Sequence, residues 1–357
     1  QHERGGKIAL HVAKTCIELY GRLFGEYPYP EFTVAETSLG GNIAGMEYPT
    51  LIMIDHRLYN TWRSLELVIA HETGHQWFYN MLGDDEYDEP WLDEGFTELA
   101  TIMYFEWNYG FEKGYEVFKM YRDRYYRYLN YRADYPLALS VGFFEKSSYP
   151  HAYYYIIYRK GSCVLYMLRM ILGDDVFFKA LREYFNKYKF DIAKIEDFIK
   201  TFEEATGQDL DWFFSHWIYG SGVPRYTIEY VKAYPMLWGY KVKIKLAQLN
   251  SPPIDIKTKL PIQVTTTGGE QIVWVWANGT SPIVEFTVKD KPIAVKIDPI
   301  DIILGKDDEE TFYVVLAESQ GIGLSQTLIY QSIGLISIAL ISFIVSFYYK
   351  KRGGRIL

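Results

Sequence analysis

The hydrophobic pattern of this chain changes its period once, near Pro224, and this change limits the folds that the sequence can adopt. Upstream of it, apolar residues recur every three or four positions, which predicts a largely helical domain at residues 1–222. Downstream, they alternate or form short runs between Pro, Gly and Asn turns, which predicts a small β-sandwich at residues 223–305. Its strands are expected at residues 226–231, 240–246, 261–266, 271–276, 284–288 and 294–297. We therefore expect an α+β protein that is mainly helical in its first part.

Glycines and capping residues mark the helix ends of the first domain. One helix is expected to follow a cap at Asn60 or Thr61 and to run until Gly83, and a second to end at Gly110. Further helices are expected at residues 5–19, from about 112, at 151–173, at 175–187, and in two short segments before Gly207 and Gly220. Strands are expected at residues 32–36 and 50–55, around a glycine-rich turn.

Residues 328–349 contain no charged side chain, and their 22 positions exceed the roughly 20 that an α-helix needs to span a bilayer. Acidic residues precede the stretch and basic residues follow it: Asp307, Asp308, Glu309, Glu310, Lys350, Lys351, Arg352 and Arg355. This pattern predicts a linker at 306–327, a transmembrane helix, and a basic cytoplasmic tail at 350–357. The expected location is a single-pass position in the cell membrane with the upstream domains outside the cytoplasm. The alternative is a buried helix of a soluble protein.

Charge and cysteine content exclude two classes of protein. The net charge of −8 and the pI near 5.5 argue against a nucleic-acid partner, because phosphate binding needs a basic surface. Two cysteines, Cys16 and Cys163, cannot form a disulfide framework. They could form one bridge or remain as two buried thiols, and the sequence leaves both possibilities open.

The segment His71-Glu72-Thr73-Gly74-His75 carries a pattern typical of a metal site. Residues four apart share one face of a helix, so the two imidazoles converge on one point. Zinc prefers such nitrogen ligands, and a catalytic zinc site keeps one coordination position for water. Glu72 lies one step round the helix, where it can reach that water instead of the metal.

Glu94 supplies the expected third ligand, eighteen intervening residues after His75. A turn after Gly83 returns the second helix antiparallel to the first and brings this carboxylate beside the histidines. Two histidines, one carboxylate and an open position are characteristic of a hydrolytic zinc centre. The alternative is a solvated carboxylate that is favoured by the helix dipole. Asp93 and Glu98 are further candidates, which could orient the histidines.

Five segments together resemble the gluzincin metallopeptidases of the aminopeptidase N type. Residues 71–77, 91–96 and 158–161 are similar to the family's metal and tyrosine motifs, and residues 217–224 to the end of its catalytic domain. Residues 44–48 (Ala-Gly-Met-Glu-Tyr) resemble its exopeptidase motif Gly-x-Met-Glu-Asn. The resemblance implies a thermolysin-like catalytic domain with one Zn²⁺ per chain, held by His71, His75 and Glu94, and peptide substrates.

The resemblance also implies roles for residues outside the metal site. Tyr158 matches the family tyrosine that donates a hydrogen bond to the oxyanion of the tetrahedral intermediate. Gly45, Met46 and Glu47 match the substrate-binding motif, in which the glutamate recognises the free α-amine of the peptide. Ala44 and Tyr48 depart from the motif, because the family has Gly and Asn there.

The function predicted from these motifs is an aminopeptidase that removes N-terminal residues with a zinc-activated water. An endopeptidase or oligopeptidase of the same fold is the first alternative, since two residues around Glu47 depart from the motif. An inactive binding module is the second, although retention of the whole set of site residues argues against it. Because the family usually places a β-domain before the catalytic domain, we expect the chain to be a fragment or a processed product.

Overall fold

The computed structural model describes residues 2–41, 43–305 and 311–316. The chain divides into two compact units, the first ending at Gly222 and the second beginning at Val223. The stretch at 328–349 that is predicted to span a membrane lies outside the described residues, as do the basic tail and most of the linker. Within the described residues, no helix is long and apolar enough to cross a bilayer.

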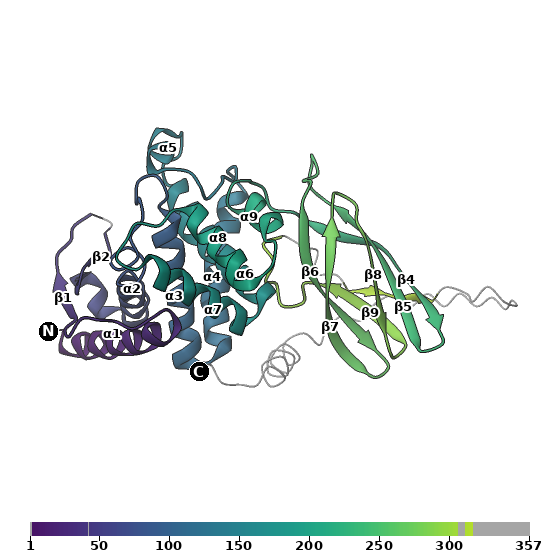
Figure 1. Ribbon diagram of the computed structural model, residues 1–357, viewed down its shortest axis with the longest axis horizontal. Helices are drawn as coiled ribbons and strands as arrows, with labels where there is room; N and C mark the ends of the chain where they lie inside the picture. Colours follow the sequence, from purple (N-terminus) through teal and green to yellow (C-terminus); the bar gives the residue numbers. More distant parts are fainter. Residues whose placement is uncertain (1, 42, 306–310, 317–357) are drawn as a thin grey trace, which may run out of the picture. The chain divides into compact units, whose positions relative to one another are not determined.

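The first unit is mainly helical, as its apolar periodicity predicts, and α3 (Trp91–Tyr109) lies at its centre (Figure 1). From Trp91 to Glu106 every residue of α3 is buried except Glu94. Around it lie α1 (Glu3–Leu23), α2 (Trp62–Gly74), α4 (Phe111–Leu129), α5 (Val141–Lys146), α6 (Gly161–Leu172), α7 (Asp174–Tyr188), α8 (Ile195–Thr206) and α9 (Asp211–Trp217). A helix buried on all sides positions its side chains rigidly, so the half-buried Glu94 has a well-defined place.

A three-stranded sheet precedes α2 in the chain. Strand β3 (Leu51–Asp55) lies between β1 (Thr33–Thr37), which is parallel to it, and β2 (Gly45–Tyr48), which is antiparallel. A 3₁₀ turn, η1 (His56–Asn60), leads from β3 to α2. The strands predicted at 32–36 and 50–55 are confirmed, whereas β2 was not predicted. Strand β2 contacts α2 and carries the Gly-Met-Glu segment of the expected substrate motif.

Two predicted helices differ from the structure. The helix expected to run until Gly83 ends at Gly74, and the chain then makes turns in which Tyr79 has a positive φ of 104°. Trp77 and Met81 are fully buried in these turns, so their apolar spacing reflects burial and not a longer helix. The helix expected at 151–173 begins instead with a π-helical segment, η2 (Tyr154–Lys160), which leads into α6.

The second unit is built from two four-stranded sheets with the orders β10-β9-β6-β7 and β11-β4-β5-β8 (Figure 1). All six predicted strands are confirmed, and two short ones follow them. The strands are β4 (Tyr226–Met236), β5 (Gly239–Gln248), β6 (Lys257–Thr266), β7 (Gly269–Asn278), β8 (Ile283–Val288), β9 (Pro292–Ile297), β10 (Phe312–Tyr313) and β11 (Val315–Leu316). Alternate residues such as Val242, Ile244 and Leu246 are buried, which is the pattern of strands that cover a common core.

Both cysteines are free thiols, and both are buried in the first unit. Of the two possibilities that the sequence left open, the structure therefore has the pair of buried thiols. The mixed helix-and-sheet architecture that the sequence predicts for the two units is also observed.

Candidate metal centre

His71 of α2, His75 directly after the end of α2, and Glu94 of α3 bring their ligating atoms together. His71 Nε2 lies 3.2 Å from His75 Nε2, and the Oε2 atom of Glu94 lies 3.2 Å and 3.5 Å from these two nitrogens. Ligands that bind zinc tetrahedrally at about 2.1 Å are separated from one another by about 3.4 Å. The three atoms therefore have the spacing of ligands that share one zinc ion.

The hydrogen bonds of these atoms also fit a cation. Within the described part of the chain, the buried Oε2 atom of Glu94 has no hydrogen-bond donor. The two Nε2 atoms face each other, and at most one proton can lie between them. Lone pairs that converge in this way without donors are what a divalent metal requires, and the donor set of two imidazoles and a carboxylate is one that zinc prefers.

Polar groups behind the histidines hold the rings in place. His75 Nδ1 lies 3.2 Å from the carbonyl oxygen of Phe78 and 3.3 Å from Oγ1 of Thr97. A proton donated from Nδ1 to that carbonyl leaves the Nε2 lone pair for a metal. His71 Nδ1 lies 3.7 Å from Oε1 of Glu98, slightly beyond hydrogen-bond distance.

Glu98 is fixed in turn by a buried arginine. Arg159 Nη1 donates to Glu98 Oε1 at 2.6 Å, and its guanidinium lies over the rings of Tyr121 and Tyr154. Asp93, the other carboxylate expected to orient a histidine, accepts the backbone N–H of Glu94 instead. The sequence analysis missed Thr97 and Arg159. For Arg159 there was one signal, its place inside the tyrosine motif.

The carboxylates and imidazoles shift one another's pKa. Burial alone would lower the pKa of His71 and His75, but Glu94 raises both pKa values, with help from Glu98 at His71 and from Glu47 at His75, and the pKa of each histidine is raised overall. Burial alone would raise the pKa of Glu94, but the two histidines outweigh it and lower it, so Glu94 is anionic at neutral pH. The pKa of Glu72 is raised by its burial and by the nearby Glu47. Among these groups, Glu72 is thus the carboxylate best suited to accept a proton.

Strand β2 lies directly against the Glu72 carboxylate. A Cβ atom placed on Gly45 would lie 2.2 Å from Glu72 Oε1, so this close approach requires glycine at position 45. A carboxylate oxygen of Glu47 also lies within 4.8 Å of ligand atoms of Glu72 and His75. Met46 lies between Gly45 and Glu47 in the sequence and is half-buried. Because side chains alternate along a strand, the Met46 side chain lies on the opposite face of β2. The structure therefore brings Gly45 and Glu47 to the centre, but not the side chain of Met46.

Gln76, two residues after the end of α2, connects this segment to the turn after β2. Its Nε2 donates to the carbonyl oxygen of Tyr48 at 3.0 Å, and its Oε1 accepts from the backbone N–H of Thr50 at 2.8 Å. This fully buried glutamine holds the expected substrate strand in register with the metal ligands. The sequence analysis did not identify its role, and the one signal for it was its place inside the motif segment 71–77.

Tyr158 reaches the metal ligands from the π-helical segment. Its hydroxyl donates a hydrogen bond to Oε1 of Glu94, and its ring stacks on that of His71 with centroids 6.0 Å apart. Burial raises the pKa of Tyr158, so its hydroxyl keeps the proton that it can donate. Wide helical turns of this kind are frequent at functional sites.

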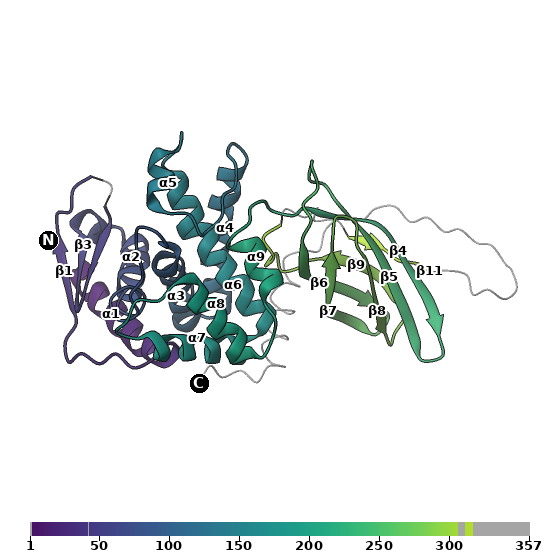
Figure 2. The same cartoon turned by 45° about the horizontal axis from the view of Figure 1, so that its top comes forward.

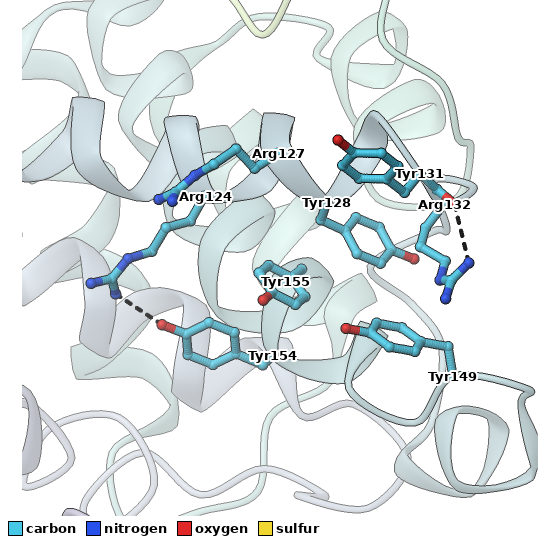
Figure 3. Close-up of a pocket in the computed structure, with 8 residues that line it drawn as sticks. All are labelled: Arg124, Arg127, Tyr128, Tyr131, Arg132, Tyr149, Tyr154 and Tyr155. Atoms are coloured by element: carbon cyan, nitrogen blue, oxygen red, sulfur yellow. Dashed lines mark hydrogen bonds between the residues drawn. The ribbon is translucent and has the colours of Figure 1, made fainter.

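A cavity of about 630 Å³ is lined in part by Tyr154 of the π-helical segment (Figure 3). Its lining is basic and aromatic: Arg124, Arg127, Tyr128, Tyr131, Arg132, Tyr149, Tyr154 and Tyr155. The Tyr154 hydroxyl accepts hydrogen bonds from Arg124, at 2.9 Å, and from Arg159. The cavity therefore adjoins the Arg159–Glu98 pair, while the metal-ligating atoms do not line it.

Comparison with known sequences points to one family. The sequence model of the peptidase family M1 domain matches residues 8–217. The alanine/arginine aminopeptidase of Saccharomyces cerevisiae is 28% identical over 240 residues, which are 64% of this chain and 28% of that protein. Aminopeptidase N of Lactococcus lactis subsp. lactis is 26% identical over 253 residues, 65% of this chain and 28% of that protein. The chain thus spans less than a third of the length of these relatives.

Comparison with solved structures supports the fold. The crystal structure of Legionella pneumophila aminopeptidase A in complex with aspartic acid superposes with a TM-score of 0.62. The match covers 85% of this chain and 35% of that one, at 18% sequence identity. At this identity the likeness concerns the arrangement of helices and strands alone.

Proposed function

This chain belongs to peptidase family M1, and from this we propose that it acts as a zinc-dependent aminopeptidase, which removes N-terminal residues from peptides. The observation that carries the proposal is the triangle of ligating atoms from His71, His75 and Glu94, with the Glu72 carboxylate beside it. The family is generally zinc-dependent, and the geometry and donor types described above fit that metal.

Proton transfer is assigned to Glu72. His71, His75 and Glu94 would hold the zinc, which would supply a Lewis acid that makes a water nucleophilic near neutral pH. The raised pKa of the Glu72 carboxylate suits a general base, which accepts the proton of the attacking water. The same carboxyl group then returns the proton to the amine that leaves.

Stabilisation of the oxyanion is assigned to Tyr158. A hydroxyl that keeps its proton and lies beside a metal ligand can donate to the negative oxygen of the tetrahedral intermediate. In the structure this hydroxyl donates to Glu94. Exchange of this partner for the substrate oxygen would give a hydrogen bond that strengthens as the reaction proceeds.

Selectivity for a free α-amine is assigned to Glu47. Its carboxylate lies close to Glu72 and His75, so an ammonium bound there would place the first peptide bond near the metal ligands. An ammonium that loses its water in a cleft needs an opposite charge, which Glu47 supplies. An N-blocked peptide has no ammonium, so Glu47 adds nothing to its binding free energy.

The experiment that tests this function compares free and N-acetylated peptides of the same sequence on the full-length protein. An aminopeptidase cleaves the free peptide much faster, and Glu47→Gln should lower kcat/KM for that peptide by about ten- to a hundred-fold, the value of one charge-assisted hydrogen bond. Equal cleavage of both peptides, unchanged in Glu47→Gln, would identify an endopeptidase instead.

The location proposed for the protein is a membrane with the peptidase unit outside the cytoplasm. Support comes from the sequence, in the uncharged stretch at 328–349 and the basic residues that follow it. Resistance to extraction by alkaline carbonate tests the anchor. Proteolysis of intact cells tests the side, because only an external unit is accessible to added protease.

A further inference from the structure

The turn between β4 and β5 exposes two large apolar side chains. Leu237 and Trp238 are 88% and 87% accessible to solvent, and Met236 and Tyr234 before them are exposed as well. Alternate residues of the same two strands are buried in the sandwich, so this turn departs from the pattern of the rest of the hairpin. Large apolar groups gathered on a surface commonly mark a contact with a partner or a membrane.

Other exposed apolar residues gather at the same end of the sandwich. Val288 at the end of β8 pairs with Tyr240, next to the turn, and the loop that follows leads to β9. Ile293 of β9 is exposed there, as are residues of the two last strands. We call this set the apolar end: Tyr234, Met236, Leu237, Trp238, Ile293, Tyr313, Val315 and Leu316.

The chain also runs toward this end where the described residues stop. Strand β11 is parallel to β4, with Val315 opposite Lys232 and Leu316 opposite Ala233 (Figure 2). Because β4 continues from Ala233 to the turn, β11 points in the direction of Leu237 and Trp238. Eleven positions, 317–327, then separate Leu316 from the uncharged stretch at 328–349. Eleven residues reach at most about 40 Å when fully extended.

We propose that the apolar end of the sandwich contacts the membrane, and that Leu237 and Trp238 insert into the interface of the bilayer that holds residues 328–349. The proposal rests on the membrane anchor put forward above and goes beyond it, since an anchor by itself requires no second contact. Tryptophan and tyrosine are the aromatic residues enriched at the boundary between headgroups and hydrocarbon. Chain direction and the two most exposed large apolar side chains among the described residues of the sandwich, Leu237 and Trp238, point to the same surface.

Charge at this end indicates what drives the contact. The loop between β8 and β9 carries Lys289, Asp290 and Lys291, which have mixed signs and are exposed. An electrostatic contact with anionic lipid needs a cluster of one sign. Insertion of the turn should therefore occur with zwitterionic lipid and at high salt, because it depends on apolar burial.

Site-specific fluorescence on the full-length protein tests the proposal. Cys16 and Cys163 are buried, so once any cysteine outside residues 1–357 is replaced by serine, an environment-sensitive thiol dye attached to Leu237→Cys reports on the turn alone. Thr280→Cys is the matched control, since it lies in an exposed turn between β7 and β8 at the opposite end of the sandwich. In phosphatidylcholine vesicles, the dye at 237 should shift to the blue, lose quenching by iodide and gain quenching by nitroxide-labelled lipid. The dye at 280 should change in none of these respects.

Three results would overturn the proposal, and they are distinct. Release of the protein by alkaline carbonate would remove the anchor on which it rests, whatever the peptidase activity. Retention with equal iodide quenching at 237 and 280 would keep the anchor and refute the contact. Protection from iodide without quenching by labelled lipid would show that a protein, such as a second copy of this chain, covers the turn.

Leu237→Ser combined with Trp238→Ser should leave hydrolysis of a soluble peptide unchanged.

Discussion

Two clusters of charged side chains include a glutamate of helix α3, one near each end of the helix. In one cluster the carboxylates are paired with an arginine, and in the other the carboxylate faces two histidines. Near its last turn, Arg169 of α6 donates through both terminal nitrogens to the two oxygens of Glu106, each at 2.7 Å. The Nε atom of the same arginine donates to Asp174 at 2.9 Å. Near the first turn, Glu94 and two histidines direct acceptor atoms at one another, and Glu94 Oε2 has no donor among the described residues.

This difference separates charges that hold the fold from charges prepared for a ligand. A buried arginine that donates well-aligned hydrogen bonds to two carboxylates already compensates their charge. Binding of a ligand to these groups would therefore add little stabilisation. Acceptors that lack donors in the protein are costly to bury unless a metal compensates for them. The arginine cluster should therefore matter for stability and the metal centre for turnover, which the following substitutions test.

The largest expected effect is on the general base. Glu72→Gln keeps the size of the side chain but cannot accept the proton of the attacking water, so kcat should fall by about 10²–10⁴-fold. Zinc content should stay the same, because Glu72 is not one of the three ligands. Stability should stay the same or rise slightly, since a buried carboxylate is replaced by a neutral amide. Steady-state kinetics with metal analysis and thermal unfolding checks all three, and full activity in this variant would refute the mechanism.

The arginine cluster should show the reverse behaviour. Arg169→Met removes the buried cation and leaves two carboxylates without it, so the free energy of unfolding should fall by about 3–5 kcal/mol. Lys179→Met is the control, because the exposed Lys179–Glu183 pair should contribute only about 0.3–0.5 kcal/mol. Urea denaturation followed by circular dichroism measures both. A wild-type stability in Arg169→Met, or a loss of zinc affinity in its folded fraction, would contradict the separation of roles.

Tyr158 gives a somewhat smaller effect on the catalytic side. Tyr158→Phe removes one donor to the oxyanion, which should lower kcat by about 10²–10³-fold with KM and zinc content little changed. Tyr155→Phe is the matched control from the same π-helical segment, since its ring stacks on Tyr128 at a centroid distance of 5.0 Å, away from the metal ligands. Equal activities in the two variants would make Tyr158 one more packing aromatic.

The two clusters also differ in how far the sequence could predict them. The metal centre follows from local rules, because His71 and His75 are four positions apart at the end of α2 and the chain returns Glu94 to them after eighteen intervening residues. The Arg169–Glu106 pair joins residues 63 positions apart and carries no motif, so only the folded chain shows it. The same is true of Arg159 and Glu98, which are 61 positions apart.

Segments whose sequence fits more than one structure were predicted least well. Strand β2 has four residues and no clear alternation, so its place beside β3 depends on contacts with α2. The apolar spacing of residues 151–173 fits an α-helix, and nothing in it marks the wider turns of η2 that direct Tyr158 toward Glu94. By contrast, the strands of the sandwich alternate regularly between turn residues, and all six were predicted correctly.

The smallest expected effect concerns Glu98, which lies between the two kinds of cluster. It pairs with Arg159 as a structural charge, yet its Oε1 atom also lies 3.7 Å from His71 Nδ1. If the carboxylate steadies that ring, Glu98→Gln should weaken zinc binding by about ten-fold, at the low end of what such outer groups contribute, because an amide is a poorer acceptor. Competition with a chelator measures the zinc affinity, and Glu98→Asp should recover part of it if charge is what His71 needs. A lower melting temperature with unchanged zinc affinity in Glu98→Gln would assign this residue wholly to the structural side of the comparison.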